Sequence, residues 1–493
     1  MMTLPKAFRT RSLTQSQKGS FVYSSQTYYR AFLNAFNRNH MIGLDGQNGR
    51  DDWDAYRTGF RIDTKFGAKN SFTVQGDGYD GSEGEIVSTV TSLAPPQPQT
   101  LNLRLGFGGW DVLSRWDHSI SPTSKTSLQV YFDRSNRGDP TYGEGRNTFD
   151  VDFQHDFAWG KRQDFVWGLG YRTTSDNIRG SIRVSFNPQS ETDELFSSFV
   201  QDEIAIIPRR VYLTIGTKLE HNHFTGFGLQ PNARLAWVIN DKRMLWFSVS
   251  RALRTPARDS EVRFNQEVLP GPNGLPLVVA VIGNPQGNED LVAYEIGYRT
   301  QLSDTLSLDL TAFYNSYTDL ISRELGNPFL ELNPAPPHLV IPISSENLVF
   351  GESHGAEMAV NWKPASRWTL SPGYSYLQAH MHRERTSNDV LTPVLLEGSS
   401  PREEAQLRSH LELTPRWAWD ASVYFVGRLP ALQIPSYTRV DTGLTWNVGR
   451  ELSFSVAGQN LLRDHHIESN SIDQIVVSSL VKRSAYAKVT WQF

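Results

Sequence analysis

Paired histidines are the clearest candidates for metal chemistry in the sequence. His380 and His382 are two residues apart. On a β-strand such residues share a face, so this pair could chelate copper or zinc. The paired histidines lie near expected outer strand ends, where solvated histidines are common. We therefore predict no resident metal ion or cofactor. His380 and His382 remain candidates for capturing a metal complex. The other pairs are His221 with His223 and His465 with His466.

The segment GESHG at 351–355 matches the G-x-S-x-G motif of a hydrolase nucleophile. That motif needs a strand, a strained turn and then a helix. The residues that follow, AEMAVNW, alternate apolar and polar side chains and therefore predict a strand instead. No glycine-rich phosphate loop, zinc-ligand spacing or convincing catalytic constellation occurs elsewhere. The sequence therefore predicts that the protein is not an enzyme.

Composition excludes several classes of protein and site. The 493 residues include no cysteine, which rules out disulfides, thiolate metal sites and cysteine nucleophiles. The formal net charge is −4, so no basic excess indicates a nucleic-acid partner. The longest obvious apolar run is LVVAVI at 277–282, far short of the ~18 residues of a membrane helix. Aromatic residues make up 12%, which favours strands and water–apolar interfaces.

A period of two dominates the chain. Leu306, Leu308 and Leu310 alternate with polar residues, as in a strand with one apolar and one polar face. Soluble strands average about 5–6 residues, whereas a tilted membrane-spanning strand needs about 9–11, and the predicted strands are long. GSFVYSS at 19–25 fits part of a further strand. The predicted strands cover 27–39, 53–66, 70–84, 100–120, 124–138, 146–159, 164–176, 192–207, 209–226, 229–240, 243–256, 289–302, 306–324, 348–364, 368–382, 402–415, 417–429, 436–449, 451–468 and 481–493.

The connections between these strands alternate in length. Short ones such as SPTS and LSDT alternate with long ones. Alternation of this kind is typical of an up-and-down barrel in an outer membrane, with tight periplasmic turns and long outer loops. The sequence therefore predicts an all-β fold, a large antiparallel transmembrane β-barrel of about 20–22 strands. The long connections are 85–99, 177–191, 257–288, 325–347, 383–401 and 469–480.

The chain ends within an alternating strand, YAKVTWQF. Val489, Trp491 and Phe493 are expected to face outer-membrane lipid, while Lys488 and Thr490 face the interior. In a closed barrel this last strand must pair with the first, because an open edge in hydrocarbon leaves backbone groups unsatisfied. The alternative is a final strand in a soluble β-domain, such as a carbohydrate-binding propeller, but soluble folds of that kind use shorter strands.

Four stretches resemble the barrel of TonB-dependent outer-membrane receptors. They are SRALRTPARDS (250–260), GNEDLVAYEIGYRTQLSDTLSLDLTAFYNSYTDL (287–320), ESHGAEMAVNWKPASRWTLSPGYSYLQA (352–379) and SVAGQNLLRD (455–464). They occur in the family's order and are spread over the second half of the chain, from residue 250 to residue 464. The aromatic end, with Trp491 and Phe493, also resembles the signal read by the barrel-assembly machinery of bacterial outer membranes, which is therefore an expected partner.

The resemblance implies a location in the outer membrane of a Gram-negative bacterium and a barrel of about 22 strands with a plugged lumen. In that family a signal peptide, a motif that contacts TonB and a globular plug precede the barrel. Only about 18 residues precede GSFVYSS here. We therefore expect residues 1–18 to be a leader or truncation scar and 19–493 the barrel, without the plug, the export signal or the TonB-contact motif. TonB is a partner by resemblance only.

Outer loops hold the candidate residues for binding a small-molecule ligand. Arg254 is expected at the outer rim, where a strand ends before Pro256. In the segment LGNPFLELNPAPPHLVIPISSEN, Phe329 and His338, with neighbouring leucines, could form a partly aromatic surface. The alternative for this segment is a loop that only packs over the barrel mouth. Arg254, Phe329, His338, His380 and His382 are the candidate ligand-binding residues.

The resemblance implies uptake of a scarce ligand, such as an iron–siderophore complex, but the sequence does not identify the ligand. Without a plug, a barrel of this size would leave a wide aqueous lumen. A passive outer-membrane pore is therefore one alternative function, and a non-functional gene remnant is another.

Overall fold

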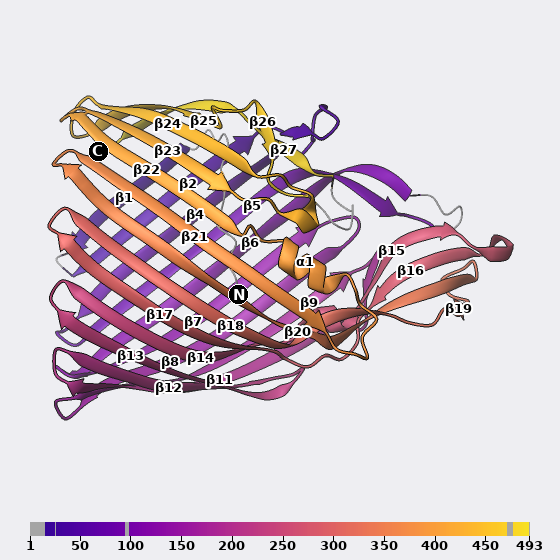
Figure 1. Cartoon of the computed structure of the whole chain (residues 1–493), viewed down its shortest axis with the longest axis horizontal. Coiled ribbons are helices and arrows are strands. Elements are labelled where there is room, and N and C mark those ends of the chain that lie inside the picture. Colours follow the sequence, from indigo (N-terminus) through magenta and orange to yellow (C-terminus); the bar gives the residue numbers. More distant parts are fainter. Residues whose placement is uncertain (1–14, 25, 94–97, 471–476, 493) are drawn as a thin grey trace.

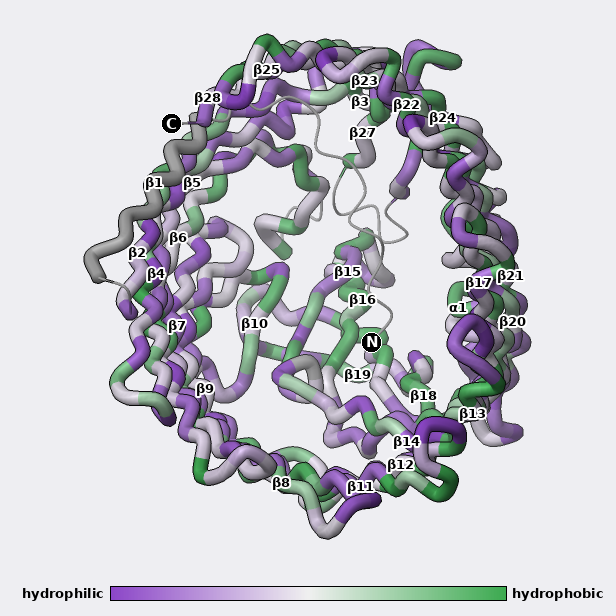
Figure 2. Tube along the Cα trace, turned by 90° about the vertical axis from the view of Figure 1, so that its left-hand side faces the viewer, coloured by the Kyte–Doolittle hydropathy of each residue, from purple (hydrophilic) through white to green (hydrophobic). Residues whose placement is uncertain are grey.

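The computed structural model describes residues 15–24, 26–93, 98–470 and 477–492. Its main feature is a 25-stranded sheet, which from β2 round to β28 curls into an oval wall (Figure 2). Four short strands lie beyond this wall, namely β10 (Val184–Phe186), β15 (Val262–Pro270), β16 (Pro276–Ile282) and β19 (Phe329–Glu331). The twenty-one wall strands are β1 (Gln15–Ser24), β2 (Thr27–Arg38), β4 (Trp53–Phe66), β5 (Asn70–Val90), β6 (Pro98–Ser121), β7 (Ser124–Gly138), β8 (Gly143–Trp159), β9 (Gln163–Arg179), β11 (Ser190–Ile207), β12 (Val211–Asn222), β13 (Gly226–Asn240), β14 (Arg243–Arg254), β17 (Glu289–Ser303), β18 (Leu306–Leu325), β20 (His338–Ala365), β21 (Trp368–Arg383), β22 (Glu403–Thr414), β23 (Trp417–Val426), β24 (Tyr437–Asn447), β25 (Leu452–Gln459) and β28 (Ser484–Trp491).

Successive wall strands pair antiparallel. The wall stays continuous where a long connection intervenes, because β14 pairs with β17 and β18 pairs with β20. Residues opposite each other in a ladder share a face of the sheet. Arg299 is opposite Asp309, and Ile296 is opposite Ala312. The ladder therefore fixes which side chains point into the barrel and which point out of it.

The two faces of the wall differ in chemistry. Outward side chains are mostly apolar, and Leu235, Phe247 and Ile296 are exposed on that face. Inward charges pair with each other, as where Arg299 Nη2 lies 2.7 Å from Asp309 Oδ2. Lysine or arginine on the lipid face costs about 2–4 kcal/mol at the midplane. The pattern therefore fits a wall that faces lipid outside and water inside.

Tryptophans form an outward band near the short turns. Trp159 and Trp237 are exposed close to the ends of β8 and β13. The rings of Trp417 and Trp446 stack with centroids 5.6 Å apart where β23 begins and β24 ends. Aromatic rings favour the boundary between hydrocarbon and head groups. The band therefore marks the boundary of the apolar zone on the short-turn side.

The last strand follows the predicted alternation. In the ladder between β25 and β28, Trp491 is opposite Leu452 and Lys488 is opposite Ser455. Trp491 is exposed. The predicted assembly signal thus includes Trp491 on the outward face, and Phe493 lies outside the described residues.

A small second layer projects from the long-loop end of the wall (Figure 1). β15 pairs antiparallel with β16, β16 runs parallel to the first residues of β20, and β19 covers the other edge of β20. Val278, Ala280 and Val340 are fully buried there, packed with Val268 and with Val90 of β5. This outer sheet therefore has a hydrophobic core of its own.

Shorter elements fill the remaining outer connections. A three-stranded sheet joins β3 (Ile42–Gly43), β27 (Ser479–Lys482) and β26 (His465–Ile467). The helices are η1 (Arg258–Glu261), η2 (Pro272–Gly274), α1 (Thr392–Gly398) and η3 (Pro430–Leu432). Among the described residues, none of the helices is long and apolar enough to cross a membrane.

The structure confirms the predicted all-β, antiparallel, up-and-down wall with short turns at one end and long loops at the other. It also adds strands. Connections 257–288 and 325–347 were expected to be loops, yet they contain β15, β16 and β19. The apolar run at 277–282 forms a strand between β15 and β20, and Val278 and Ala280 on one of its faces are fully buried. The predicted boundary between leader and barrel, at residue 18, lies inside β1, and residues 1–14 lie outside the described residues.

Strand direction alternates along the wall, so an odd number of strands gives its two ends the same direction. Both β1 and β28 run toward the short turns. Within the described residues, β1 pairs with β2 and β28 pairs with β25, and no ladder joins β1 to β28. The expected antiparallel pairing of the last strand with the first is therefore not found, because the two strands run parallel.

Neighbouring residues of β18 provide a direct test of the two faces. Leu310 points outward and Thr311 points inward. We expect Leu310→Lys to lower the free energy of unfolding from lipid vesicles by about 2–4 kcal/mol, and Thr311→Lys to lower it by less than about 1 kcal/mol. Urea titration of the refolded variants measures both values. Equal costs at the two positions would contradict the assignment of the faces.

Candidate ligand-binding site at the outer mouth

A pocket of about 670 Å³ lies at the outer mouth of the barrel. The outer ends of β14, β17, β18, β20 and β21 form its wall side, and α1 forms the opposite side. In the view along the barrel, α1 lies against the inner side of the wall near β20 and β21 (Figure 2). The volume of the pocket is within the range of ligand pockets, about 300–1,000 Å³. Apolar side chains in its lining include Leu291, Leu320, Leu377, Met381, Leu395 and Leu396.

Carboxylates hold α1 in this position. Asp389, which is buried, accepts the N–H of Thr392 at 2.9 Å through Oδ1 and the N–H of Arg323 at 2.6 Å through Oδ2. Burial opposes ionisation, but these hydrogen bonds outweigh it and lower the pKa of Asp389 below its usual range. Glu397 of α1 accepts the N–H of Met381 at 2.7 Å. The helix is therefore tied to β18 at its start and to β21 near its end.

Polar groups in the pocket are paired with one another. Arg254 Nε lies 2.6 Å from Glu289 Oε2, and the Arg254 side chain is 68% exposed. Tyr317 Oη lies 3.1 Å from Ser353 Oγ, and Asn315 Nδ2 donates to the same oxygen at 3.2 Å. The guanidinium thus stands at the rim, and Asn315, Tyr317 and Ser353 satisfy each other on the wall. This arrangement suits a ligand that is largely apolar and has one group able to reach Arg254.

The structure brings Arg254 to the pocket but does not bring His380 and His382 there. Both histidines lie on the outward face of β21, opposite Glu352 and Phe350 of β20. Met381, the residue between them, is the one that lines the pocket. Metal capture by His380 and His382 stays a prediction, and it would have to occur on the outer surface of the wall.

Ser353 lies within a continuous strand and not at a nucleophile elbow. β20 continues on both sides of GESHG, and Ser353 is buried on the inward face. His354 is the next residue and therefore points to the opposite face. The prediction that GESHG is part of a strand is confirmed.

His338 is buried in the outer sheet, with only 1% of its surface exposed. Its Nε2 lies 2.9 Å from Glu331 Oε2, and its Nδ1 lies 3.0 Å from the carbonyl oxygen of Pro336. Arg263 donates two hydrogen bonds to Glu331, at 2.8 and 2.7 Å. Burial raises the pKa of Glu331, but the bonds from Arg263 and His338 outweigh it and lower the pKa below its usual range. His338 therefore supports the outer sheet and is not part of its surface.

Phe329 does contribute to an exposed apolar surface. It lies on β19 at the edge of the outer sheet and is exposed, as are Leu330 and Leu332. This surface is separate from the pocket beneath α1, because none of the three residues lines that pocket. The structure thus places the predicted residues in three different regions.

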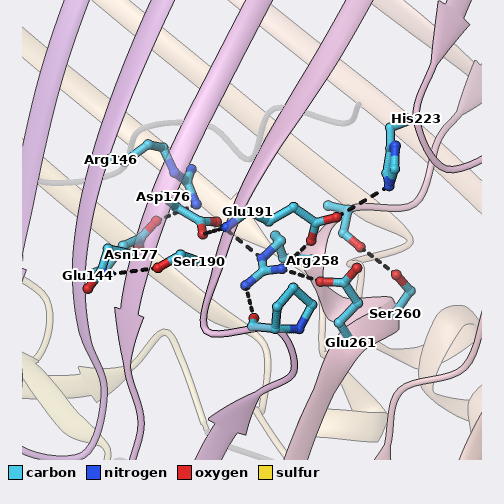
Figure 3. A network of polar contacts seen from close by, with 12 residues as sticks. Glu144, Arg146, Asp176, Asn177, Ser190, Glu191, His223, Arg258, Ser260 and Glu261 are labelled. Atoms are coloured by element: carbon cyan, nitrogen blue, oxygen red, sulfur yellow. Dashed lines mark hydrogen bonds and ion pairs between the residues drawn. The ribbon is translucent and has the colours of Figure 1, made fainter.

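A buried arginine that sequence reasoning missed organises the segment that follows β14 (Figure 3). Arg258 of η1 is almost completely buried and forms ion pairs with Asp176 of β9, Glu191 of β11 and Glu261. Its Nη2 also donates to the carbonyl oxygen of Pro188 at 2.5 Å. The segment after β14 is thereby fixed to the connection between β9 and β11. The sequence signal was weak, since Arg258 is one of three arginines in the stretch SRALRTPARDS (250–260).

The carboxylates around Arg258 outnumber its positive charge. Burial and a hydrogen bond shared with Glu191 raise the pKa of Glu261 to about 7, and Arg258 offsets only part of that rise. His223 Nε2 lies 3.3 Å from Glu191 Oε1 on the other side. Within the described residues, no group of three or more side chains is placed to hold a metal ion. The network is therefore best described as a structural clamp, and it contains a carboxyl group whose pKa is raised.

A family model for the TonB dependent receptor-like β-barrel matches residues 5–461. The chain belongs to this family, which consists of receptors and transporters and places it in the outer membrane of a Gram-negative bacterium. Curated relatives include the iron-regulated outer membrane virulence protein of Vibrio cholerae serotype O1. The protein of the Classical Ogawa strain is 24% identical over 371 residues, 72% of this chain and 51% of the relative. That of the El Tor Inaba strain is 25% identical over 303 residues, 58% of this chain and 42% of the relative. The chain thus spans about half the length of the curated relatives it matches.

Solved structures share the fold. A mutant of the ferric enterobactin receptor PfeA from Pseudomonas aeruginosa matches with a TM-score of 0.72 and 14% identity, over 95% of this chain and 76% of that one. The siderophore receptor PirA from Acinetobacter baumannii gives a TM-score of 0.72 and 15% identity, over 96% and 76%. The copper transporter OprC gives 0.69 and 13%, over 98% and 79%. At these identities the likeness shows the fold alone.

The clamp around Arg258 gives one prediction. Removing one partner of a buried ion pair costs about 3–5 kcal/mol, because the other charges stay buried. We expect Arg258→Ala to speed amide hydrogen exchange at residues 187–191 and 257–261 by at least about 100-fold, since each tenfold change corresponds to about 1.4 kcal/mol. Arg254→Ala, which removes an exposed pair, should change exchange there less than tenfold. Similar exchange in both variants would show that Arg258 does not hold the segment.

Glu261 gives a prediction about pH. Its pKa is raised in the folded protein, so the stability it contributes is complete below its ordinary pKa and is lost as pH rises through about 7. After correction for intrinsic rates, hydrogen exchange at 257–261 should therefore accelerate between about pH 4.5 and 7 and level off above that. Glu261→Gln, which keeps the shape but cannot ionise, should show no such step. A step of equal size in both proteins would assign the pH dependence to another group.

Proposed function

We propose that this chain is the barrel of an outer-membrane receptor that takes up a scarce ligand, with an iron–siderophore complex as the leading candidate. The pocket beneath α1 is the observation that carries the proposal. It is large enough for an organic ligand and opens at the long-loop end, and it combines apolar walls with an exposed guanidinium. The names of the relatives and structural neighbours support the same class of ligand, since they include an iron-regulated outer membrane virulence protein, a ferric enterobactin receptor and a siderophore receptor.

Arg254 is the residue of this site best placed to meet an anionic chelate. Its guanidinium is at the pocket rim and is engaged by Glu289 through Nε, and a guanidinium has five N–H donors. A negatively charged group arriving from outside can therefore be bound without breaking the pair with Glu289. This gives the site a charged entrance above an apolar interior.

Several partners belong to the same proposal. The apolar outer face, bounded by the tryptophan band, is the surface for outer-membrane lipid. The last strand, with Trp491 exposed near its end, is the segment that the barrel-assembly machinery would engage. Gating by a plug and energising by TonB would come from polypeptide other than the strands described above, because the described residues form the wall and its outer connections.

Binding measurements test this function directly. Purified protein in nanodiscs is titrated with a panel of ferric catecholate and ferric hydroxamate siderophores, with tryptophan fluorescence as the readout. Hydrogen bonds to charged groups contribute about 1.5–3 kcal/mol, so Arg254→Ala should weaken binding of the preferred anionic complex about tenfold or more. Arg115→Ala removes an inward arginine that pairs with Asp117 on β6. That control should bind like the wild type.

Two results would count against the proposal. One is that no complex in the panel binds to folded protein. The other is ligand-independent conductance in planar bilayers without saturable binding, which would favour a passive pore. Loss of binding in Arg115→Ala as well as in Arg254→Ala would show that the site is not at the outer mouth.

A further inference from the structure

Most of the polar side chains on the wall side of the pocket beneath α1 already have partners, and Ser399 and Ser400 after α1 add two hydroxyls at its edge. Glu397 is engaged by the N–H of Met381, and Ser353 is held by Tyr317 and Asn315. Glu289 accepts the N–H of Ile321 at 2.8 Å, in addition to its pair with Arg254 at the rim. A buried polar group that already has its partners gains little from a ligand, and a ligand's own polar groups would be left unpaired inside.

The apolar groups available for contact come from two directions. Leu291 and Leu377 project from the wall, and Leu395 and Leu396 project from α1. The space between them has an aliphatic surface on both sides. Because α1 is tied at both ends by hydrogen bonds to β18 and β21, the pocket is preformed and loses little order when it is filled.

We propose that this pocket binds an apolar arm, alkyl or aryl, of the chelate, and that it does not contact the metal centre. The inference rests on the proposed function and names the ligand class within it: a metal chelate whose organic scaffold carries a hydrophobic substituent. The chelating, charged part of the ligand stays at the rim near Arg254. Affinity is then set by the arm that enters beneath α1, and the identity of the bound metal has little effect.

A homologous ligand series tests this directly. The probes are ferric trihydroxamates with amide-linked alkyl arms of two, six and ten carbons, the gallium forms of the same compounds, and an alkyl amide without a chelating group. Each methylene that becomes buried should tighten binding by up to about fourfold. Wild-type affinity should therefore rise steeply with arm length until the pocket is full. Replacing iron by gallium should leave each dissociation constant within twofold.

Filling the pocket provides the matched variant. Ala379 lines the pocket on the inward face of β21, so Ala379→Trp should remove the dependence on arm length. Ala457→Trp adds the same ring to the inward face of β25, away from the pocket, and should preserve that dependence. Slower gel migration after boiling, which marks a barrel that was folded beforehand, checks both variants. Leu396→Ala, which enlarges the pocket, is a second test. It should weaken binding of the ten-carbon compound more than binding of the shorter ones.

The outcomes separate the inference from the function. Chelates that bind with no dependence on arm length, or with a dependence that Ala379→Trp leaves intact, would overturn the inference and leave receptor function standing. If the alkyl amide binds in an Ala379-dependent way and no chelate binds, the apolar pocket is real and the receptor function falls. If no probe binds to folded protein, both are overturned.

Discussion

Every feature of this protein depends on the need to satisfy backbone hydrogen bonds where water is absent. In hydrocarbon an unpaired N–H or carbonyl costs several kcal/mol, so a chain that crosses with strands must form a continuous ladder. The wall achieves this because the strands on either side of a long connection pair directly with each other. β14 pairs with β17 and β18 pairs with β20, while the residues between them fold beyond the wall. Because side chains alternate along each strand, the same ladder sorts them, with leucine and phenylalanine outside and paired charges inside. Membrane location and a polar lumen thus follow from one constraint.

The wall could be predicted from sequence because its signal is local. Alternation such as that of Leu306, Leu308 and Leu310 needs only neighbouring residues, and short turns are visible as polar interruptions. The outer sheet could not be predicted in the same way. Its ladders join residues such as Val278 and Val340, which are far apart in the chain, and its run LVVAVI at 277–282 is apolar at every position. An uninterrupted apolar run of six residues has no alternation of apolar and polar side chains, so periodicity alone does not identify it as a strand.

The site was only partly predictable for the same reason. Arg254 could be placed at the rim, since strand end and outer loop are local features. Which face His380 and His382 occupy depends on the register with β20, and that register is a long-range property. Arg258 was missed because its partners Asp176 and Glu191 come from strands laid down much earlier in the chain. Arginines in loops are mostly exposed, so the sequence gives no reason to expect a buried one. A buried arginine is recognised only when the structure shows its burial.

The parity of the wall has a consequence for its seam. An antiparallel ladder spaces its hydrogen bonds in alternating narrow and wide pairs, whereas a parallel ladder spaces them evenly and at a slant. Because β1 and β28 both run toward the short turns, a ladder formed directly between them would be parallel. One added strand between them, running toward the long loops, would instead form an antiparallel ladder with each. The hydrogen-bond spacing at this one place on the circumference therefore reports whether the number of strands is odd or even.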